Sequence, residues 1–145
     1  PTDAEVAAVL DALPLDALQV YAAAERVAAL RARFGRPVWR AIGVATAADL
    51  PAEAGAADRF VLEAKPPAAA TRPGGNATAF DWSLLRGWRA PAPWLLAGGL
   101  TPATVAAAIR ATGAAAVDVS SGVERAPGVK DPALIRAFIA AARAA

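Results

Sequence analysis

Residues 93–100 read PWLLAGGL, and residues 117–124 read VDVSSGVE. Each stretch is a short apolar run, typical of a buried strand, that passes directly into small residues. Two such strand ends lying side by side can surround a phosphate with backbone N–H groups, without any positively charged side chain. These two segments therefore indicate a phosphorylated small molecule as the ligand.

The remainder of the chain alternates predicted helices with predicted strands. Periodicity and capping residues predict helices over residues 3–13, 25–34, 46–56, 80–88, 101–111 and 132–144. Apolar runs between them predict parallel strands near residues 16–21, 38–43, 59–63, 94–97 and 115–119, in that spatial order. This alternation indicates an α/β fold with a parallel sheet, either open and doubly wound or part of a (β/α)8 barrel. A full (β/α)8 barrel has eight strands and takes roughly 250 residues, so a chain of 145 residues with about five strands would form a partial barrel.

Composition limits the chemistry that is available. The chain has 145 residues, of which 57% are hydrophobic, so we expect one domain over residues 1–145. Its net charge is only +2 and its basic residues are scattered, so we expect no nucleic-acid partner. There is no cysteine and no histidine, so the usual zinc sites, thiolate nucleophiles and imidazole bases are excluded. We expect no metal and no cofactor, and acid–base chemistry that uses carboxylates, lysine or tyrosine.

Membrane and secretion signals are not found in the sequence. No apolar run approaches the length that spans a bilayer, and the first residues lack the charged and apolar regions of a signal peptide. We expect a cytoplasmic protein that does not bind membranes.

Glu63 is the first candidate catalytic residue. It stands at the end of a predicted strand, where α/β enzymes place their reactive groups, and could act as an acid. It could equally be a salt-bridged residue at the rim, paired with Lys65 or Arg40. A loop follows in which Gly74, Gly75 and Asn76 would let the backbone approach a ligand closely, so we predict that these three residues contact the substrate.

Asp118 and the two glycine- and serine-containing turns form the second candidate group. Asp118 alternates with Val117 and Val119, so its carboxylate should point to the ligand-facing side of a barrel; alternatively it is a buried aspartate tied to a Lys or Arg. Taken singly, the turns could be ordinary caps with nothing bound. Together they follow the last two strands, as in the standard barrel phosphate site. The predicted phosphate ligands are Gly98, Gly99, Ser120, Ser121 and Gly122.

Four segments carry a resemblance to a known family. They are AGGLTP at residues 97–102, VDVSSGVE at 117–124, PGVKD at 127–131, and GGN at 74–76 with FDW at 80–82. In this order they resemble the C-terminal two-thirds of phosphoribosylanthranilate isomerase, a (β/α)8 enzyme of tryptophan biosynthesis. The resemblance runs over essentially the whole chain.

The resemblance implies an Amadori rearrangement, in which an acid protonates the sugar ring oxygen and a base removes the C2 proton. The family's acid, an aspartate, aligns with Glu63, and an aspartate of its eighth strand aligns with Asp118. The family's base is a cysteine of the first strand, and an arginine that follows the second strand contacts the substrate; both belong to a region that this chain does not contain. The chain also departs from the family at Gln19-Val20-Tyr21-Ala22, where the family has Gln-Leu-His-Gly. A second departure is Ala77, which stands where the family's Gly-Gly-Asn-Gly or Gly-Gly-Thr-Gly loop ends in glycine.

Three functional hypotheses follow. The first is a phosphoribosylanthranilate isomerase, or part of one, whose turnover as this chain is impaired. The second is a non-catalytic phosphosugar-binding pseudoenzyme. The third is a partial barrel that forms a homodimer through its open sheet edges, because unpaired edges and an uncovered apolar interior must be shielded.

Overall fold

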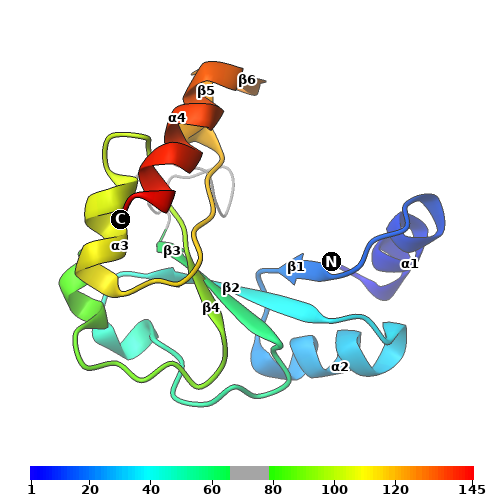
Figure 1. Ribbon diagram of the computed structural model, residues 1–145. Coiled ribbons are helices and arrows are strands. Elements are labelled where there is room, and N and C mark those ends of the chain that lie inside the picture. The colour runs from blue at the N-terminus through cyan, green and yellow to red at the C-terminus, as the bar shows by residue number, and fades with distance from the viewer. Residues whose placement is uncertain (66–78) are drawn as a thin grey trace.

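A four-stranded parallel sheet forms the centre of the computed structural model, which describes residues 1–65 and 79–145. Its strands are β1 (Leu18–Val20), β2 (Val38–Val44), β3 (Arg59–Ala64) and β4 (Trp94–Leu96), in that spatial order (Figure 1). All three neighbouring pairs are parallel, as the alternating pattern predicted. The α/β class and the parallel sheet are confirmed.

The fifth predicted strand, residues 115–119, is reduced to one parallel bridge between Leu96 and Val117. The N–H of Leu96 donates to the carbonyl of Ala116 at 3.0 Å, and the N–H of Asp118 donates to the carbonyl of Leu96 at 2.9 Å. Immediately afterwards Ser120 adopts φ −120° and ψ −84°, which is not an extended conformation. Its position and direction were predicted correctly, but its length was overestimated because the backbone turns so soon.

The described residues form four α-helices: α1 (Asp3–Ala12), α2 (Ala24–Phe34), α3 (Val105–Thr112) and α4 (Pro132–Arg143). Thr2 and Glu5 form a capping box at the start of α1, and Gly35 ends α2 in the left-handed region at φ 62°. The side chain of Asp131 accepts hydrogen bonds from two N–H groups at the start of α4. These three helix ends follow local capping chemistry.

Other predicted helices differ from the structure. Residues 46–56 form only a single 3₁₀ turn, η1 (Ala47–Asp49), because Pro51 and the positive φ of Gly55 interrupt it. Residues 80–88 shorten to η2 (Trp82–Leu85). The helix predicted from residue 101 begins at Val105, since the N–H of Thr101 donates to the Thr104 hydroxyl at 3.0 Å in a preceding turn.

A small hairpin precedes α4 and was not predicted. After the 3₁₀ turn η3 (Ser121–Val123), strands β5 (Glu124–Ala126) and β6 (Val129–Lys130) pair antiparallel. Gly128 supplies the turn with φ 77°. The Pro127-Gly128 dipeptide is a turn signal, so the hairpin was detectable from the sequence.

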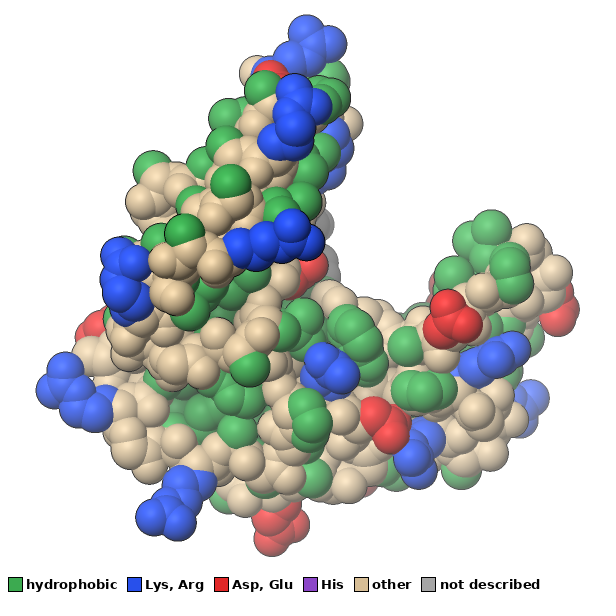
Figure 2. Space-filling model, in the orientation of Figure 1, with side chains coloured by type: hydrophobic (Ala, Val, Ile, Leu, Met, Phe, Trp, Pro, Cys, Tyr) green, Lys and Arg blue, Asp and Glu red, His purple; other side chains and the backbone are tan. Residues whose placement is uncertain are grey.

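The two faces of the sheet differ in their cover. One face packs against the helices and holds most of the core, including Phe60, Leu62, Leu96, Val38 and Leu30, which are almost fully buried. The other face carries a smaller cluster made of Ala41, Val61 and Ala97, with Trp39 and Leu95 packed against it. Figure 2 shows the molecule hollowed between the end that carries α4 and the end that carries α1. Among the described residues, no helix has both the length and the apolar character needed to cross a membrane.

Candidate active site

Glu63 lies near the end of β3 and, at 6% exposure, is the buried charged residue of the described core. The Tyr21 hydroxyl donates a hydrogen bond to its Oε1. The two cations considered as its partners are engaged elsewhere. Lys65 pairs with Asp49 at 3.8 Å, and the Nε of Arg40 donates to the carbonyl of Ala22 at 3.0 Å. Glu63 is therefore hydrogen-bonded to a phenol and not salt-bridged at a rim.

The surroundings of Glu63 favour its protonated form. Burial raises the pKa of its carboxyl group above the ordinary 4.5, and the negative charge of Asp118 raises it further, while the hydrogen bond from Tyr21 acts in the opposite direction. The pKa of Tyr21 is also raised, first by its own burial and then by its hydrogen bond to Glu63 and by the nearby charges. Tyr21 thus remains a proton donor in this pair, and Glu63 is suited to the role of an acid.

The turn after β4 approaches the end of β3 closely. Gly98 has φ 79° and Gly99 has φ 64°, a region that favours glycine. A Cβ on Gly98 would lie 2.9 Å from the backbone nitrogen of Ala64 and 3.1 Å from Cβ of Glu63. The absence of a side chain at Gly98 therefore lets this turn lie directly beside Glu63.

Gly122 connects the second turn to the first. A Cβ placed on it would lie 1.7 Å from the carbonyl oxygen of Leu100 and 2.9 Å from the carbonyl carbon. Only glycine allows η3 to pack against the backbone that follows Gly99. The two glycine-containing turns thus form one continuous wall of backbone.

Lys130 supports this wall from the hairpin side. Its Nζ donates to the carbonyl oxygen of Ser120 at 2.8 Å and to the Ser120 hydroxyl at 3.1 Å, and it forms an ion pair with Glu124 at 2.7 Å. The lysine belongs to the PGVKD segment that carried the family resemblance, but its contact with Ser120 was not predicted. It lies ten residues away in the chain, and a hairpin brings it back.

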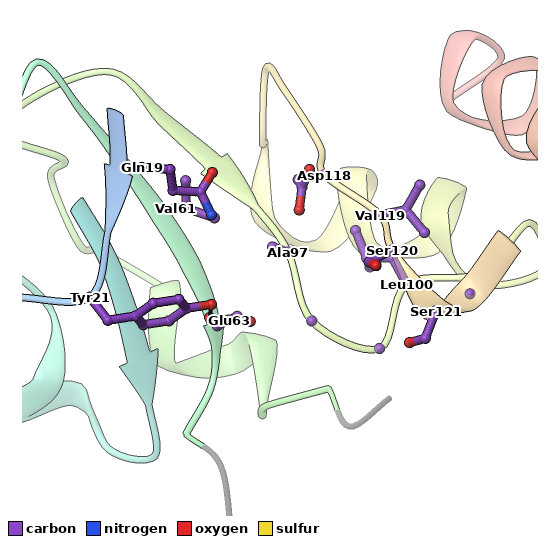
Figure 3. A pocket seen from close by; sticks show the side chains of 13 residues that line it. Gln19, Tyr21, Val61, Glu63, Ala97, Leu100, Asp118, Val119, Ser120 and Ser121 are labelled. Atoms are coloured by element: carbon purple, nitrogen blue, oxygen red, sulfur yellow. Dashed lines mark hydrogen bonds between the residues drawn. The ribbon is translucent and has the colours of Figure 1, made fainter. Parts of the chain in front are cut away.

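Asp118 is exposed and faces the space between the two turns and β3 (Figure 3). Its predicted alternation with Val117 and Val119 agrees with this placement, since both valines pack against the large core cluster. Neither Lys nor Arg forms an ion pair with it among the described residues. The alternative of a buried, charge-paired aspartate does not describe this side chain.

A cleft of about 230 Å³ joins these parts. Of the predicted site residues it is lined by Glu63, Gly98, Gly99, Asp118, Ser120, Ser121 and Gly122. Gly74, Gly75 and Asn76, predicted to contact the substrate, lie outside the described residues. None of the described lining residues is Lys or Arg, so an anion held here would rely on backbone N–H groups.

The sequence analysis marked residues 19–22 as a departure from the family pattern but gave Gln19 and Tyr21 no role of their own. Gln19 and Tyr21 line the cleft, whereas Leu18 and Val20, which alternate with them, are buried in the core. The two-residue period of a strand predicts that residues 19 and 21 share one face. That signal was present in the sequence, but it does not reveal which distant residue they meet.

Comparison with known proteins places this geometry in a family. The protein-family model for N-(5′phosphoribosyl)anthranilate (PRA) isomerase matches residues 1–141. The N-(5′-phosphoribosyl)anthranilate isomerase of Acidiphilium cryptum is 66% identical over 145 residues, which cover 100% of this chain and 71% of that protein.

Solved structures agree with this match. The phosphoribosyl anthranilate isomerase of Thermotoga maritima is 32% identical with a TM-score of 0.79, over 98% of this chain and 68% of that one. A phosphoribosyl anthranilate isomerase in complex with reduced 1-(o-carboxyphenylamino)-1-deoxyribulose 5-phosphate is 30% identical with a TM-score of 0.76, over 98% and 66%. The chain therefore belongs to the N-(5′-phosphoribosyl)anthranilate isomerase family, the isomerases of tryptophan biosynthesis.

Proposed function

We propose that the cleft binds phosphoribosylanthranilate, with the substrate phosphate against the backbone of Gly98, Gly99 and residues 120–122. One observation carries the proposal: seven residues chosen from the sequence line a single cleft in a chain of this family. The similar enzyme solved with a 5-phosphate ligand supports the same class of ligand. The proposal retains the cytoplasmic location expected from the sequence.

Glu63 is the proposed acid. It would transfer its proton to the ring oxygen of the sugar as the ring opens, leaving a carboxylate that accepts a hydrogen bond from Tyr21. Its burial supports this role, because a raised pKa keeps the proton available closer to neutral pH than an ordinary glutamate would. Asp118, exposed at the opposite side of the cleft, is proposed to orient the substrate.

The base that removes the C2 proton has no counterpart of the expected type in these 145 residues, which include no cysteine and no histidine. Tyr21 is a poor substitute because its raised pKa keeps its hydroxyl protonated. We therefore propose that this chain binds the phosphorylated ligand but turns the substrate over slowly.

Ligand binding is the first test. Isothermal titration calorimetry with reduced 1-(o-carboxyphenylamino)-1-deoxyribulose 5-phosphate should show one site per chain. Competition by inorganic phosphate should weaken the binding, since both would occupy the same backbone turns. Absence of any binding would overturn the proposed function.

Turnover is the second test. Consumption of phosphoribosylanthranilate by the purified chain should be orders of magnitude slower than the roughly 1–10³ s⁻¹ of typical enzymes. Binding with no turnover at all would favour the alternative of a phosphosugar-binding pseudoenzyme. An ordinary enzyme rate would contradict the proposed impairment and would require a base of another residue type.

Self-association is a second proposal, carried by exposed apolar side chains at both ends of the molecule. Val9 and Leu13 are exposed at the α1 end, and Ile135 and Ile139 are exposed on α4. Strand β1 is at one edge of the sheet and pairs only with β2 among the described residues. We propose a homodimer that covers these surfaces. Sedimentation velocity should show a dimer that Ile139→Lys weakens, whereas a monomer at every concentration would exclude it.

A further inference from the structure

The Tyr21–Glu63 contact joins two segments that the sequence keeps far apart. Tyr21 follows β1, Glu63 belongs to β3, and they are separated by 42 positions in the chain. Strand β2 lies between β1 and β3, and its residues Ala41 and Gly43 are small. In the strand register Ala41 pairs with Val61 and Gly43 pairs with Glu63, so the β2 residues beside the carboxyl group on the cleft side are small. Trp39, on the same side of β2, pairs with Gln19 and Arg59 farther from Glu63. The tyrosine ring reaches across this face toward Glu63 (Figure 3).

We infer that Tyr21 is a positioning residue for Glu63: its hydroxyl holds Oε1 of the carboxyl group and so fixes how Glu63 is presented to the cleft. This inference rests on the proposed role of Glu63 as the acid. A glutamate side chain has three rotatable bonds, and a carboxyl group held at one oxygen loses most of that freedom. The phenol also stabilises the carboxylate that remains after the proton has been given away.

None of the described charged groups near Glu63 donates a hydrogen bond to its carboxyl group in place of Tyr21. On β2, Arg40 donates to the carbonyl of Ala22, and beyond the end of β3 Lys65 pairs with Asp49. On the far side of the cleft stands Asp118, which has the same sign of charge as an ionised Glu63. Within the described residues, the hydroxyl of Tyr21 is thus the hydrogen-bond donor that stabilises the ionised carboxyl group.

The inference predicts opposite effects for two variants on the same group. Tyr21→Phe keeps the ring but removes the hydroxyl, so the pKa of Glu63 should rise. Asp118→Asn removes a repelling charge and leaves the hydrogen bond in place, so the pKa of Glu63 should fall. The measurement is a ¹³C NMR titration of the glutamate carboxyl carbons, with the Glu63 signal identified by its loss in Glu63→Gln.

A second readout uses the fact that the chain has a single tyrosine. The four tryptophans also absorb near 295 nm but do not ionise as the pH rises, so the pH-dependent change in absorbance there reports on Tyr21, with circular dichroism recorded in parallel to confirm that the protein stays folded. Glu63→Gln should move the titration midpoint down toward that of free tyrosine. The matched control Glu53→Gln, an exposed glutamate outside the cleft, should leave the midpoint where it is.

The outcomes separate this inference from the proposed function. An unchanged Glu63 titration in Tyr21→Phe, or an unchanged Tyr21 midpoint in Glu63→Gln, overturns the positioning role even if the phosphate ligand still binds. If the wild-type chain does not bind the ligand but both titrations shift as expected, the proposed function is overturned. The coupling between Tyr21 and Glu63 is then still established. If both titrations shift, Tyr21→Phe should also displace the acidic limb of any measurable pH–rate profile in the same direction as the Glu63 pKa.

Discussion

The two walls of the cleft are built in different ways. One wall, formed by residues 98–100 and 120–122, consists of backbone, and its shape depends on positions that lack a Cβ. The other, formed by Glu63 and Tyr21, consists of side chains from different strands that meet through one hydrogen bond. Each turn of the backbone wall is formed by residues that are contiguous in the sequence. The side-chain wall instead requires β1, β2 and β3 to lie beside one another in the right order.

This difference determines what each wall tolerates. We expect the backbone wall to keep its shape when side chains beside it are changed. An atom added at Gly98 or Gly122, where two backbone segments touch, should force the turns apart. We expect isosteric changes at Tyr21 or Glu63 to leave the fold intact and to change the pKa of the remaining partner. Variants of the two walls should therefore separate into those that alter folding or binding and those that alter titration.

The largest effect is expected from Gly122→Ala. The added Cβ would lie 1.7 Å from the carbonyl oxygen of Leu100, so the two turns must move apart. We expect the free energy of unfolding, measured by urea denaturation, to fall by about 3 kcal/mol. Gly128→Ala is the matched control, because nothing lies within 4 Å of its Cβ and only its positive φ is penalised, at about 1 kcal/mol. Equal losses in the two variants would show that the close approach at Gly122 is not rigid.

A change at Gly99 should affect binding more than folding. With φ 64°, a valine there is strained and places a branched side chain on the wall that faces the ligand. Gly99→Val should reduce affinity for the 5-phosphate ligand by at least about tenfold, or 1.4 kcal/mol, in calorimetry. Its circular dichroism spectrum should remain that of the wild type. Unchanged affinity would refute a backbone phosphate site.

Removal of the Lys130 ammonium group tests whether the backbone wall needs support from a side chain. Lys130→Met eliminates the hydrogen bonds to Ser120 while it keeps most of the side-chain volume. Because this lysine is partly exposed, we expect a loss in ligand affinity of only about fivefold, or roughly 1 kcal/mol. Arg136→Met, which removes an exposed cation of α4, should change affinity less. Equal losses would indicate a general effect of charge.

The smallest effect concerns stability at the side-chain wall. Burial raises the pKa of Glu63 above 4.5, so the folded state holds a proton that the unfolded chain releases. Stability contributed by this proton is present below pH 4.5 and is lost as the pH rises through the raised pKa. Glu63→Gln should therefore melt at a higher temperature than the wild type at pH 8, by a few degrees at most. The difference should disappear at acidic pH, and a stabilisation independent of pH would contradict this origin.

Much of the fold was readable from local signals. The order and direction of the four strands followed from their alternation with helices, and the ends of α1, α2 and α4 followed from Thr2, Gly35 and Asp131. The prediction of a helix over residues 46–56 was wrong, because Pro51 cannot donate a helical hydrogen bond and Gly55 has a positive φ, although the segment is rich in alanine. The hairpin at β5 and β6 was missed although Pro127-Gly128 marks its turn.

The backbone wall of the candidate site could be predicted from the sequence, whereas the contact that forms the side-chain wall could not. Gly98, Gly99, Ser120, Ser121 and Gly122 were identified because each turn carries its own motif, and the structure brings them into one cleft. The partner of Glu63 was not identified, since Lys65 and Arg40 are nearer in the chain than Tyr21. In the sequence, the changes at residues 21 and 63 stand as separate departures from the family pattern. Their hydrogen bond depends on strand register, which no local motif encodes.

The close approach of Gly98 to the end of β3 also has a consequence for ligand length. Because Gly98 has no side chain, the turn after β4 packs directly against the segment of β3 that carries Glu63. The backbone therefore sets the distance between this turn and the main chain of Glu63, and the hydrogen bond from Tyr21 sets where the carboxyl group lies beyond it. For the proposed phosphate site and acid, this close packing predicts selection by ligand length: a sugar phosphate one carbon longer or shorter should keep its phosphate in the same turn and present the wrong atom to Glu63.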